Sequence, residues 1–297
     1  MKKAIYVLFS VLLTASLISW NWTKTQHPTV VKAEVIECLN METQQAYQLE
    51  AGTPTFAGMH PSPIVVNPEN LLGKMMSFDA ADGKQANAYF IAAKKKSNKY
   101  LIVIQEWWGL VPHIEDVADR FAAAGFTALA PDLYHGESST EPDGAGKLMM
   151  GLNLAQAAKD LSGAVDYLQT TTGHQKVGVV GYCMGGGLTL VLACQRPDAV
   201  AAAAPYYGVI PWPSAQPDWS KLAAKVVGEY AELDDFAGPE TVNALEAQLK
   251  ALGKDATLNI HAGSQHAFFN DARPEVFDAA AAKMSFDRTL DLFRTTL

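Results

Sequence analysis

The stretch that decides the fold runs from Lys176 to Gly187 and has the sequence KVGVVGYCMGGG. Its first half is apolar and rich in valine, which is typical of a buried strand in a parallel sheet. Its second half is rich in glycine and leads into an apolar run without helix breakers, Leu188 to Cys194, which predicts a helix. The sequence therefore predicts a strand, a sharp turn and a helix in direct succession, with Cys183 at the turn.

Cys183 has the position of a nucleophile in this pattern. Gly181 and Gly185, two residues to either side, leave room for the strained backbone of such a turn. The N-terminus of the following helix favours the negatively charged thiolate, which is the reactive form of cysteine. The alternative is a buried cysteine with a purely structural role, and the short G-x-C-x-G pattern does not decide between the two.

The composition bounds the class of protein. The chain has 297 residues, of which 49% are hydrophobic and 18% charged, and this suits one sizeable α/β domain. A formal net charge of −8 and a single short basic run at 94–96 argue against a nucleic-acid partner. Cys183 and Cys194 would lie about 16 Å apart along one helix, too far for a disulfide. No spacing typical of a metal site occurs, so we expect neither a metal nor an organic cofactor.

The first 72 residues differ from the rest of the chain. Residues 1–20 have two lysines followed by an apolar run, which is typical of an export signal. No clear cleavage site follows, so an uncleaved membrane anchor is the alternative. Residues 21–72 are polar and punctuated by prolines, and they predict a linker or a wrapping arm. We therefore expect a periplasmic or secreted protein, or one attached to a membrane through this N-terminal segment only.

Strands and helices alternate from residue 73 to residue 297, which we take as the main domain. A turn at Asp82-Gly83 joins the first two predicted strands as a hairpin. Longer stretches predict helices, among them 112–124, 152–169 and a terminal helix at 274–294. The predicted strands lie at 74–79, 86–93, 100–105, 126–130, around 177–180, and at 200–204, 223–228 and 256–261. This alternation predicts an α/β fold with a mostly parallel sheet, helices on both faces, and ligands at the carboxyl ends of the strands.

A nucleophile at Cys183 needs a base, and His266 has the position of one. It lies between the last predicted strand and the terminal helix, which is where an α/β-hydrolase carries its catalytic histidine. The other six histidines compete less well. Among them, His113 and His135 follow strand ends and remain candidate substrate contacts.

Three carboxylates are candidates for the site, two of them for orienting the imidazole and one for contacting the thiol. Asp234 and Asp235 follow the predicted strand at 223–228, where a carboxylate that orients the imidazole is expected, and the pattern leaves the choice between them open. An acidic turn is also often simply solvated. Glu106 ends an apolar strand beside two tryptophans, so it would be partly desolvated unless paired and would face the thiol. The alternative for Glu106 is a side chain at the rim that points to solvent.

The remaining parts of the predicted site are backbone donors and aromatic side chains. The N–H groups of Trp107 and Met184 are expected to face the acyl oxygen as an oxyanion hole. Aromatic residues at or after strand ends predict an aromatic-lined pocket, and those we assign to it are Trp108, Tyr134, Tyr207 and Phe268.

Five motifs in order resemble those of the dienelactone hydrolase family. They are Gln105-Glu106-Trp107-Trp108-Gly109, Pro131-Asp132-Leu133-Tyr134, Gly181-Tyr182-Cys183-Met184-Gly185-Gly186, Tyr230-Ala231-Glu232-Leu233-Asp234 and His266-Ala267-Phe268. The resemblance covers about residues 74–296 and implies an α/β-hydrolase fold with a triad of Cys183, Asp234 and His266. It also implies that Glu106 holds the resting thiol until substrate displaces it, and it favours Asp234 over Asp235.

The sequence departs from this family at two places in the substrate pocket. Family members that act on dienelactone carry arginines for its carboxylate, one shortly after the catalytic histidine and one after the Pro-Asp-Leu-Tyr stretch. Here Asn270 and His135 occupy those places, and we include both in the predicted pocket. Neither place therefore offers an arginine to pair with a carboxylate on the substrate.

These observations predict a hydrolase that acts on small-molecule esters or lactones through an acyl-enzyme, with a monomer favoured. A non-catalytic binding protein on the same scaffold is the alternative, because fold alone does not imply activity. A disulfide oxidoreductase is disfavoured because the chain has no C-x-x-C motif.

Overall fold

The computed structural model describes residues 44–45, 48–49, 62–63, 70–95, 97–210 and 216–297. The predicted export signal at 1–20 and nearly all of the predicted arm at 21–72 lie outside these residues. By its internal contacts the chain separates into residues 1–31 and residues 32–297, and the description below concerns the second unit. Within the described residues, no helix is both long and apolar enough to cross a membrane.

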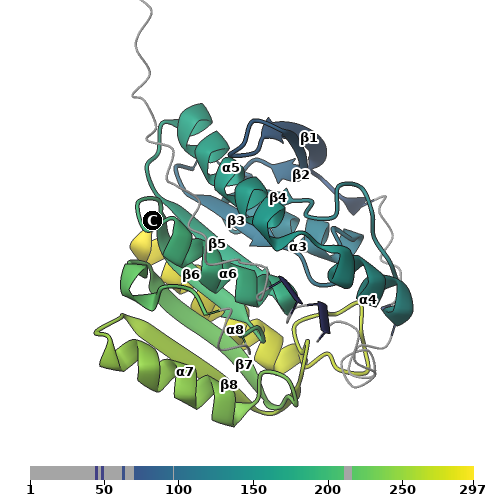
Figure 1. Ribbon diagram of the computed structural model, residues 1–297, viewed down its shortest axis with the longest axis vertical. Coiled ribbons are helices and arrows are strands. Elements are labelled where there is room, and N and C mark those ends of the chain that lie inside the picture. Colours follow the sequence, from purple (N-terminus) through teal and green to yellow (C-terminus); the bar gives the residue numbers. More distant parts are fainter. Residues whose placement is uncertain (1–43, 46–47, 50–61, 64–69, 96, 211–215) are drawn as a thin grey trace, which may run out of the picture. The chain divides into compact units, whose positions relative to one another are not determined.

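An eight-stranded sheet forms the centre of this unit (Figure 1). Its strands are β1 (Lys74–Asp79), β2 (Gln85–Ile91), β3 (Tyr100–Ile104), β4 (Thr127–Pro131), β5 (Val177–Tyr182), β6 (Val200–Tyr206), β7 (Lys225–Leu233) and β8 (Ala256–Gln265). They lie in the order β1-β2-β4-β3-β5-β6-β7-β8. The predicted hairpin of β1 and β2 is antiparallel and β2 is antiparallel to β4, whereas the six strands from β4 to β8 pair in parallel.

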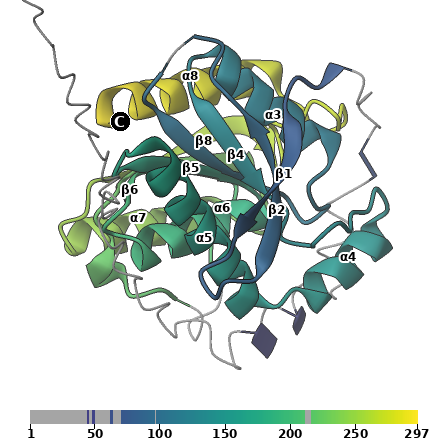
Figure 2. The same ribbon diagram turned by 90° about the horizontal axis from the view of Figure 1, so that it is seen from above.

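Helices cover both faces of the sheet. They are α3 (Pro112–Ala123), α4 (Pro142–Gly151), α5 (Leu154–Thr172), α6 (Met184–Gln195), α7 (Pro239–Ala251) and α8 (Ala279–Thr296). Seen from above, α3 and α8 lie on one face, and α5, α6 and α7 lie on the other (Figure 2). Ring contacts join the first pair, since the Phe121 and Phe286 centroids are 5.0 Å apart. The predicted α/β fold with a mostly parallel sheet and helices on both faces is confirmed.

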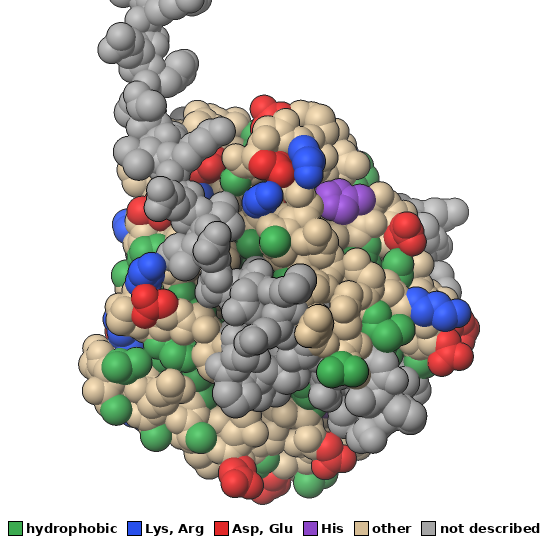
Figure 3. All heavy atoms as spheres, viewed as in Figure 1, with side chains coloured by type: hydrophobic (Ala, Val, Ile, Leu, Met, Phe, Trp, Pro, Cys, Tyr) green, Lys and Arg blue, Asp and Glu red, His purple; other side chains and the backbone are tan. Residues whose placement is uncertain are grey.

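The buried strands explain why the sheet is parallel at its centre. All residues of β4 and β5 are buried, and so are four of the five residues of β3. A strand buried on both faces needs a continuous apolar sequence, which is what these segments have. On the face shown in Figure 3, basic and acidic side chains are interspersed around the rim instead of forming one patch.

Several elements differ from the predictions, and strand β7 runs from Lys225 to Leu233 instead of 223–228. Helix α4 was not predicted, because three glycines within its ten residues lower its helix propensity. The terminal helix begins at Ala279 instead of 274, since the Asp278 side chain accepts hydrogen bonds from the N–H groups of Ala280 and Ala281 and caps the helix there. Strand β8 continues to Gln265, so the residues just before His266 belong to the strand and not to a loop.

Candidate active site

Five side chains of the predicted site follow the carboxyl ends of neighbouring parallel strands. Cys183 directly follows β5, Tyr207 follows β6, Asp234 follows β7 and His266 follows β8. Glu106 is the second residue after β3. Because the carboxyl ends of parallel strands meet at one edge of a sheet, the fold brings these residues to a common place.

The turn at Cys183 is strained. Its backbone has φ 54° and ψ −117°, which a residue with a side chain rarely adopts, and its N–H donates to the carbonyl of Tyr206 at 3.1 Å. A Cβ atom at Gly181 would collide with the carbonyl oxygen of Gly185. A Cβ atom at Gly185 would approach the carbonyl oxygen of Gln105 to 2.5 Å. Both glycines of the G-x-C-x-G motif are therefore required by the turn that places Cys183 at the start of α6.

A histidine and a carboxylate meet beside Cys183. The Nδ1 atom of His266 lies 2.7 Å from Oδ2 of Asp234, and both residues are buried. The other carboxylate oxygen accepts hydrogen bonds from the N–H groups of Phe236 at 2.8 Å and Ala237 at 2.9 Å, which fix its orientation. The imidazole also interacts with the side chain of Cys183. The structure thus brings together the three residues that the sequence proposed as a triad.

The pKa values of His266 and Asp234 are both shifted by their surroundings. Burial opposes a charged imidazole, but the negative charges of Asp234 and of the Cys183 thiolate outweigh it and raise the pKa of His266 to about 10. Burial also opposes charge on Asp234, but His266 and the backbone donors outweigh it and lower the pKa of this carboxyl. Asp235, the other candidate from the sequence, is exposed. At neutral pH this geometry therefore favours an imidazolium next to a carboxylate.

Glu106 is almost completely buried, with 1% of its surface exposed, and it is held by two neutral donors. Its Oε1 accepts from the hydroxyl of Tyr207 at 3.3 Å, and its Oε2 accepts from the side-chain amide of Asn270 at 2.8 Å. Burial, followed by the negative charge of Glu106, raises the pKa of Tyr207, and the charge of Cys183 adds to this. Two side chains predicted to line the substrate pocket thus bind the carboxylate instead. No local sequence signal indicated this role.

The loop that carries Asn270 is tied to α3. Asp271 lies 3.2 Å from Nδ1 of His113 and 2.5 Å from Nη2 of Arg120. Burial opposes charge on Asp271, but the hydrogen bond from His113 and the charge of Arg120 outweigh it and lower its pKa to about 2. His113, a candidate substrate contact in the sequence, therefore contacts this loop.

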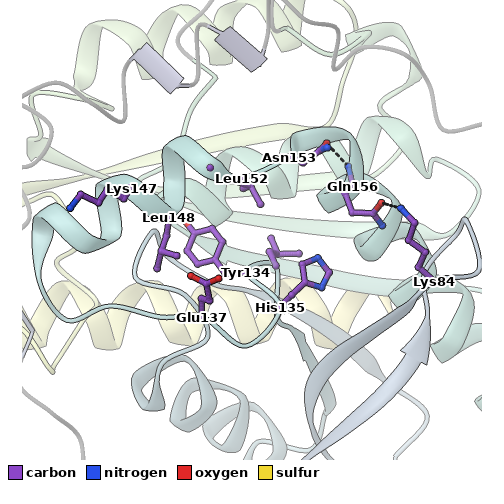
Figure 4. A pocket seen from close by; sticks show the side chains of 11 residues that line it. Lys84, Tyr134, His135, Glu137, Lys147, Leu148, Leu152, Asn153 and Gln156 are labelled. Carbon is purple, nitrogen blue, oxygen red and sulfur yellow. Dashed lines mark hydrogen bonds between the residues drawn. The ribbon is translucent and has the colours of Figure 1, made fainter.

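A cavity of about 450 Å³ is lined by Tyr134 and His135, two residues of the predicted pocket (Figure 4). The hydroxyl of Tyr134 donates to the carbonyl of Trp107 at 3.1 Å and lies 3.5 Å from the sulfur of Met184. The ring of Tyr134 therefore connects the cavity with the two residues whose N–H groups were predicted as oxyanion donors. Other residues that line the cavity are Lys84, Leu133, Glu137, Lys147, Leu148, Gly151, Leu152, Asn153 and Gln156.

The predicted pocket residues Trp108 and Phe268 do not line this cavity, and both are fully buried. The ring of Trp108 packs on Trp107 with centroids 4.8 Å apart, and Phe268 packs on Tyr207 at 5.4 Å. In the described part of the chain, no group of three or more His, Cys, Asp or Glu side chains is placed to hold a metal ion.

The fold and the arrangement at the strand ends define an α/β-hydrolase. The family model described as "Dienelactone hydrolase family" matches residues 86–297. The chain therefore belongs to the dienelactone hydrolase family, as the resemblance of its motifs predicted, and it is a hydrolase.

Individual relatives agree with this assignment. "Protein usf" from Aquifex pyrophilus is 33% identical over 239 residues, which cover 76% of this chain and 100% of the relative. A "Putative carboxymethylenebutenolidase" from Aquifex aeolicus is 30% identical over 234 residues, with the same coverage of both chains. The crystal structure of a "Putative Dienelactone Hydrolase" from Klebsiella pneumoniae superposes with a TM-score of 0.65 at 25% identity, covering 75% of this chain and 99% of that chain.

Proposed function

We propose that this protein hydrolyses carboxylic esters or lactones of small molecules through a covalent acyl-enzyme. Cys183 is the nucleophile, His266 transfers protons and Asp234 orients the imidazole. The observation that carries the proposal is the 2.7 Å contact between Asp234 and an imidazole that also interacts with the thiol at the strained turn. The relative named for a carboxymethylenebutenolidase supports a lactone or ester as the substrate.

In the first half of the reaction, the thiolate of Cys183 attacks the carbonyl carbon of the ester. The carbonyl oxygen becomes an oxyanion, which the N–H groups of Trp107 and Met184 stabilise, and one such donor contributes roughly 3 kcal/mol in comparable sites. The bond to the alkoxide then breaks, and the imidazolium of His266 gives its proton to the alkoxide. The raised pKa of His266 supports this step, because it keeps the proton on the imidazole until the leaving group needs it.

In the second half, the neutral imidazole of His266 takes a proton from a water molecule. The resulting hydroxide attacks the thioester, the bond to sulfur breaks, and the carboxylic acid leaves while Cys183 returns as a thiolate. Asp234 stabilises the imidazolium that forms again. The products are one acid and one alcohol, or a hydroxy acid if the substrate is a lactone.

Glu106 is the second carboxylate of this proposal. It faces the resting thiol, and substrate binding displaces it from that place. Tyr207 and Asn270 limit where it can go, because both of its oxygens already accept hydrogen bonds from them. The hydrogen bonds from these two neutral donors orient the carboxylate of Glu106.

The test is hydrolysis of p-nitrophenyl acetate by purified protein and by the Cys183→Ala variant. We expect kcat to fall by about a thousandfold or more, because loss of a nucleophile removes the covalent route. Cys194→Ala is the matched control, since Cys194 is equally buried but lies inside α6 away from the turn. Retention of more than about a tenth of the activity in Cys183→Ala would contradict the assignment. If the unmodified chain fails on a panel of esters and lactones, the non-catalytic binding protein becomes the better interpretation.

A further inference from the structure

Two hydrogen-bonded contacts connect the N-terminal region of the chain to the two ends of α4. The side chain of Gln44 donates to the carbonyl of Leu152 at 2.6 Å and accepts from the N–H of Leu154 at 2.9 Å. The hydroxyl of Ser62 donates to the carboxylate of Glu141 at 3.1 Å. Leu152 and Leu154 lie at the break between α4 and α5, and Glu141 immediately precedes α4.

The Gln44 contact satisfies backbone groups that neither helix can satisfy by itself. Leu152 is the residue that follows α4, and Leu154 is the first residue of α5, where the N–H has no partner within the helix. The side chain of Asn153 does not serve these groups, because it accepts from the N–H of Gln156 and caps α5. A glutamine side chain has an NH2 group that donates and an oxygen that accepts, and in Gln44 both form a hydrogen bond.

Helix α4 depends on such contacts because its own sequence supports it weakly. Three of its ten residues are glycine, and its first residue is preceded by Glu141, whose side chain makes no capping hydrogen bond to the helix. Only Ala145, Gly146 and Met149 are buried along it. A short helix with little intrinsic stability is free to shift unless its ends are held.

Helix α4 and the break after it form one wall of the cavity that Tyr134 also lines, and the hydroxyl of Tyr134 contacts Trp107 and Met184. Leu148, Gly151 and Leu152 line the cavity on this side, and Tyr134 and His135 line it on the other (Figure 4). A shift of α4 therefore changes the width of the cavity. Gln44 contacts the carbonyl of a lining residue directly.

The contact belongs to a part of the chain that precedes the family match. The match begins at residue 86, so Gln44 and Ser62 both lie upstream of it. The family model therefore does not cover this contact.

We propose that Gln44 is a positioning residue that holds α4 against the cavity and so sets which substrates fit beside Tyr134. In this proposal the cavity takes the non-reacting part of an ester, where Leu148 and Leu152 contribute apolar surface among polar side chains such as Gln156. This specificity role rests on the proposed ester hydrolysis, whereas the holding of α4 by Gln44 does not.

The experiment compares Gln44→Met with Gln45→Met in the full chain. Methionine is similar in length to glutamine but cannot form both hydrogen bonds, and Gln45 is an exposed neighbour of the same type that serves as the matched control. Hydrogen exchange of the amides at 142–156 measures how firmly α4 is held, independently of activity. We expect exchange to become about fivefold faster in Gln44→Met only, as the loss of one hydrogen bond of ordinary net strength implies. Gln44→Glu, which can still accept from Leu154, should give a smaller change.

The kinetic part compares p-nitrophenyl acetate with p-nitrophenyl benzoate. We expect KM for the benzoate to change about tenfold in Gln44→Met, with kcat for the acetate within about twofold, because a change of fit by one methylene group corresponds to about tenfold or more. Unchanged exchange, or an equal effect of Gln45→Met, would overturn the positioning role. Faster exchange with an unchanged ratio of the two esters would overturn the specificity role alone. If no ester is hydrolysed by the unmodified chain, the proposed function fails, and the exchange result alone decides whether Gln44 holds α4.

Discussion

The protein contains two buried pairs of histidine and carboxylate, built from the same two strands. In one pair, Nε2 of His261 in β8 lies 2.8 Å from the carboxylate of Glu229 in β7. In the other, His266 and Asp234 follow the same strands and lie 2.7 Å apart. The members of the second pair are each five residues further along the chain than those of the first. Similar distances and burial therefore occur in two different settings.

The surroundings separate the two pairs. The carboxylate of Glu229 also accepts from Nη1 of Arg288 at 2.6 Å, so a cation from α8 compensates its charge. His261 lies within its strand and packs on the ring of Phe268, with centroids 4.8 Å apart. His266 lies just beyond its strand and interacts with Cys183.

This comparison teaches that a buried histidine and carboxylate do not by themselves make a reactive site. Such pairs also occur as structural ion clusters, which perturb charges without any chemistry. What distinguishes the second pair is its place at the carboxyl edge of the sheet and the thiol beside it.

The largest expected effect comes from removing each carboxylate in turn. Asp234→Asn should lower kcat about a hundredfold or more, because the imidazole loses the partner that orients it and stabilises its charge. Glu229→Gln should leave kcat within about threefold but lower the free energy of unfolding by about 2 kcal/mol, since Arg288 and His261 lose a charged partner. Ester hydrolysis and urea unfolding of both variants measure the two effects.

Asp235→Asn is the control for Asp234→Asn, because its side chain is exposed and adjacent. We expect it to change kcat by less than about threefold. The opposite ranking of the two aspartates would reassign the orienting role, and a large loss of kcat in Glu229→Gln would make the two pairs one functional unit.

A second expected effect is on the pH dependence of stability. The pKa of His266 in the folded protein, about 10, lies above the roughly 6.5 of an unfolded chain, so the folded state binds this proton more tightly. Its contribution to stability is therefore complete below about pH 6.5 and is lost as the pH rises toward 10. Urea unfolding of the unmodified chain and of His266→Gln should show a difference in stability that shrinks between about pH 6.5 and pH 10.

A difference that stayed constant or grew over this range would contradict the charged state of the pair at His266. His261→Gln, measured in parallel, shows the cost of removing a buried imidazole from the pair that lacks the thiol.

The smallest expected effect concerns two asparagines that donate hydrogen bonds to buried glutamates. Asn270 donates to Glu106, and Asn259 donates to Glu229. Asn270→Ala removes the 2.8 Å hydrogen bond to Glu106 and leaves the hydrogen bond from the Tyr207 hydroxyl, so we expect kcat/KM to fall about threefold to tenfold. Asn259→Ala removes a weaker, 3.4 Å contact to Glu229, whose charge Arg288 already compensates, and should leave kcat/KM unchanged. Equal effects of the two substitutions on kcat/KM would remove the distinction between the two regions.

The amino-acid sequence was enough to predict the alternation of strands and helices and the sharp turn at Cys183. It also determined the order of Cys183, Asp234 and His266 along the chain, with each placed after a strand. These features depend on local patterns, namely apolar periodicity, glycine spacing and strand ends, and local patterns can be read without coordinates. The family followed from the same motifs, because they are short and contiguous.

The packing of helices and strands established which side chains meet. It placed Asp234 and not Asp235 on His266, and it placed Asn270 on Glu106, 164 residues away in the chain. The structure also contains α4, a helix that was not predicted because of its three glycines, and a contact between Gln44 and the end of that helix. Hydrogen bonds between distant segments depend on how helices and strands pack, and nothing in the neighbouring sequence of either partner records them.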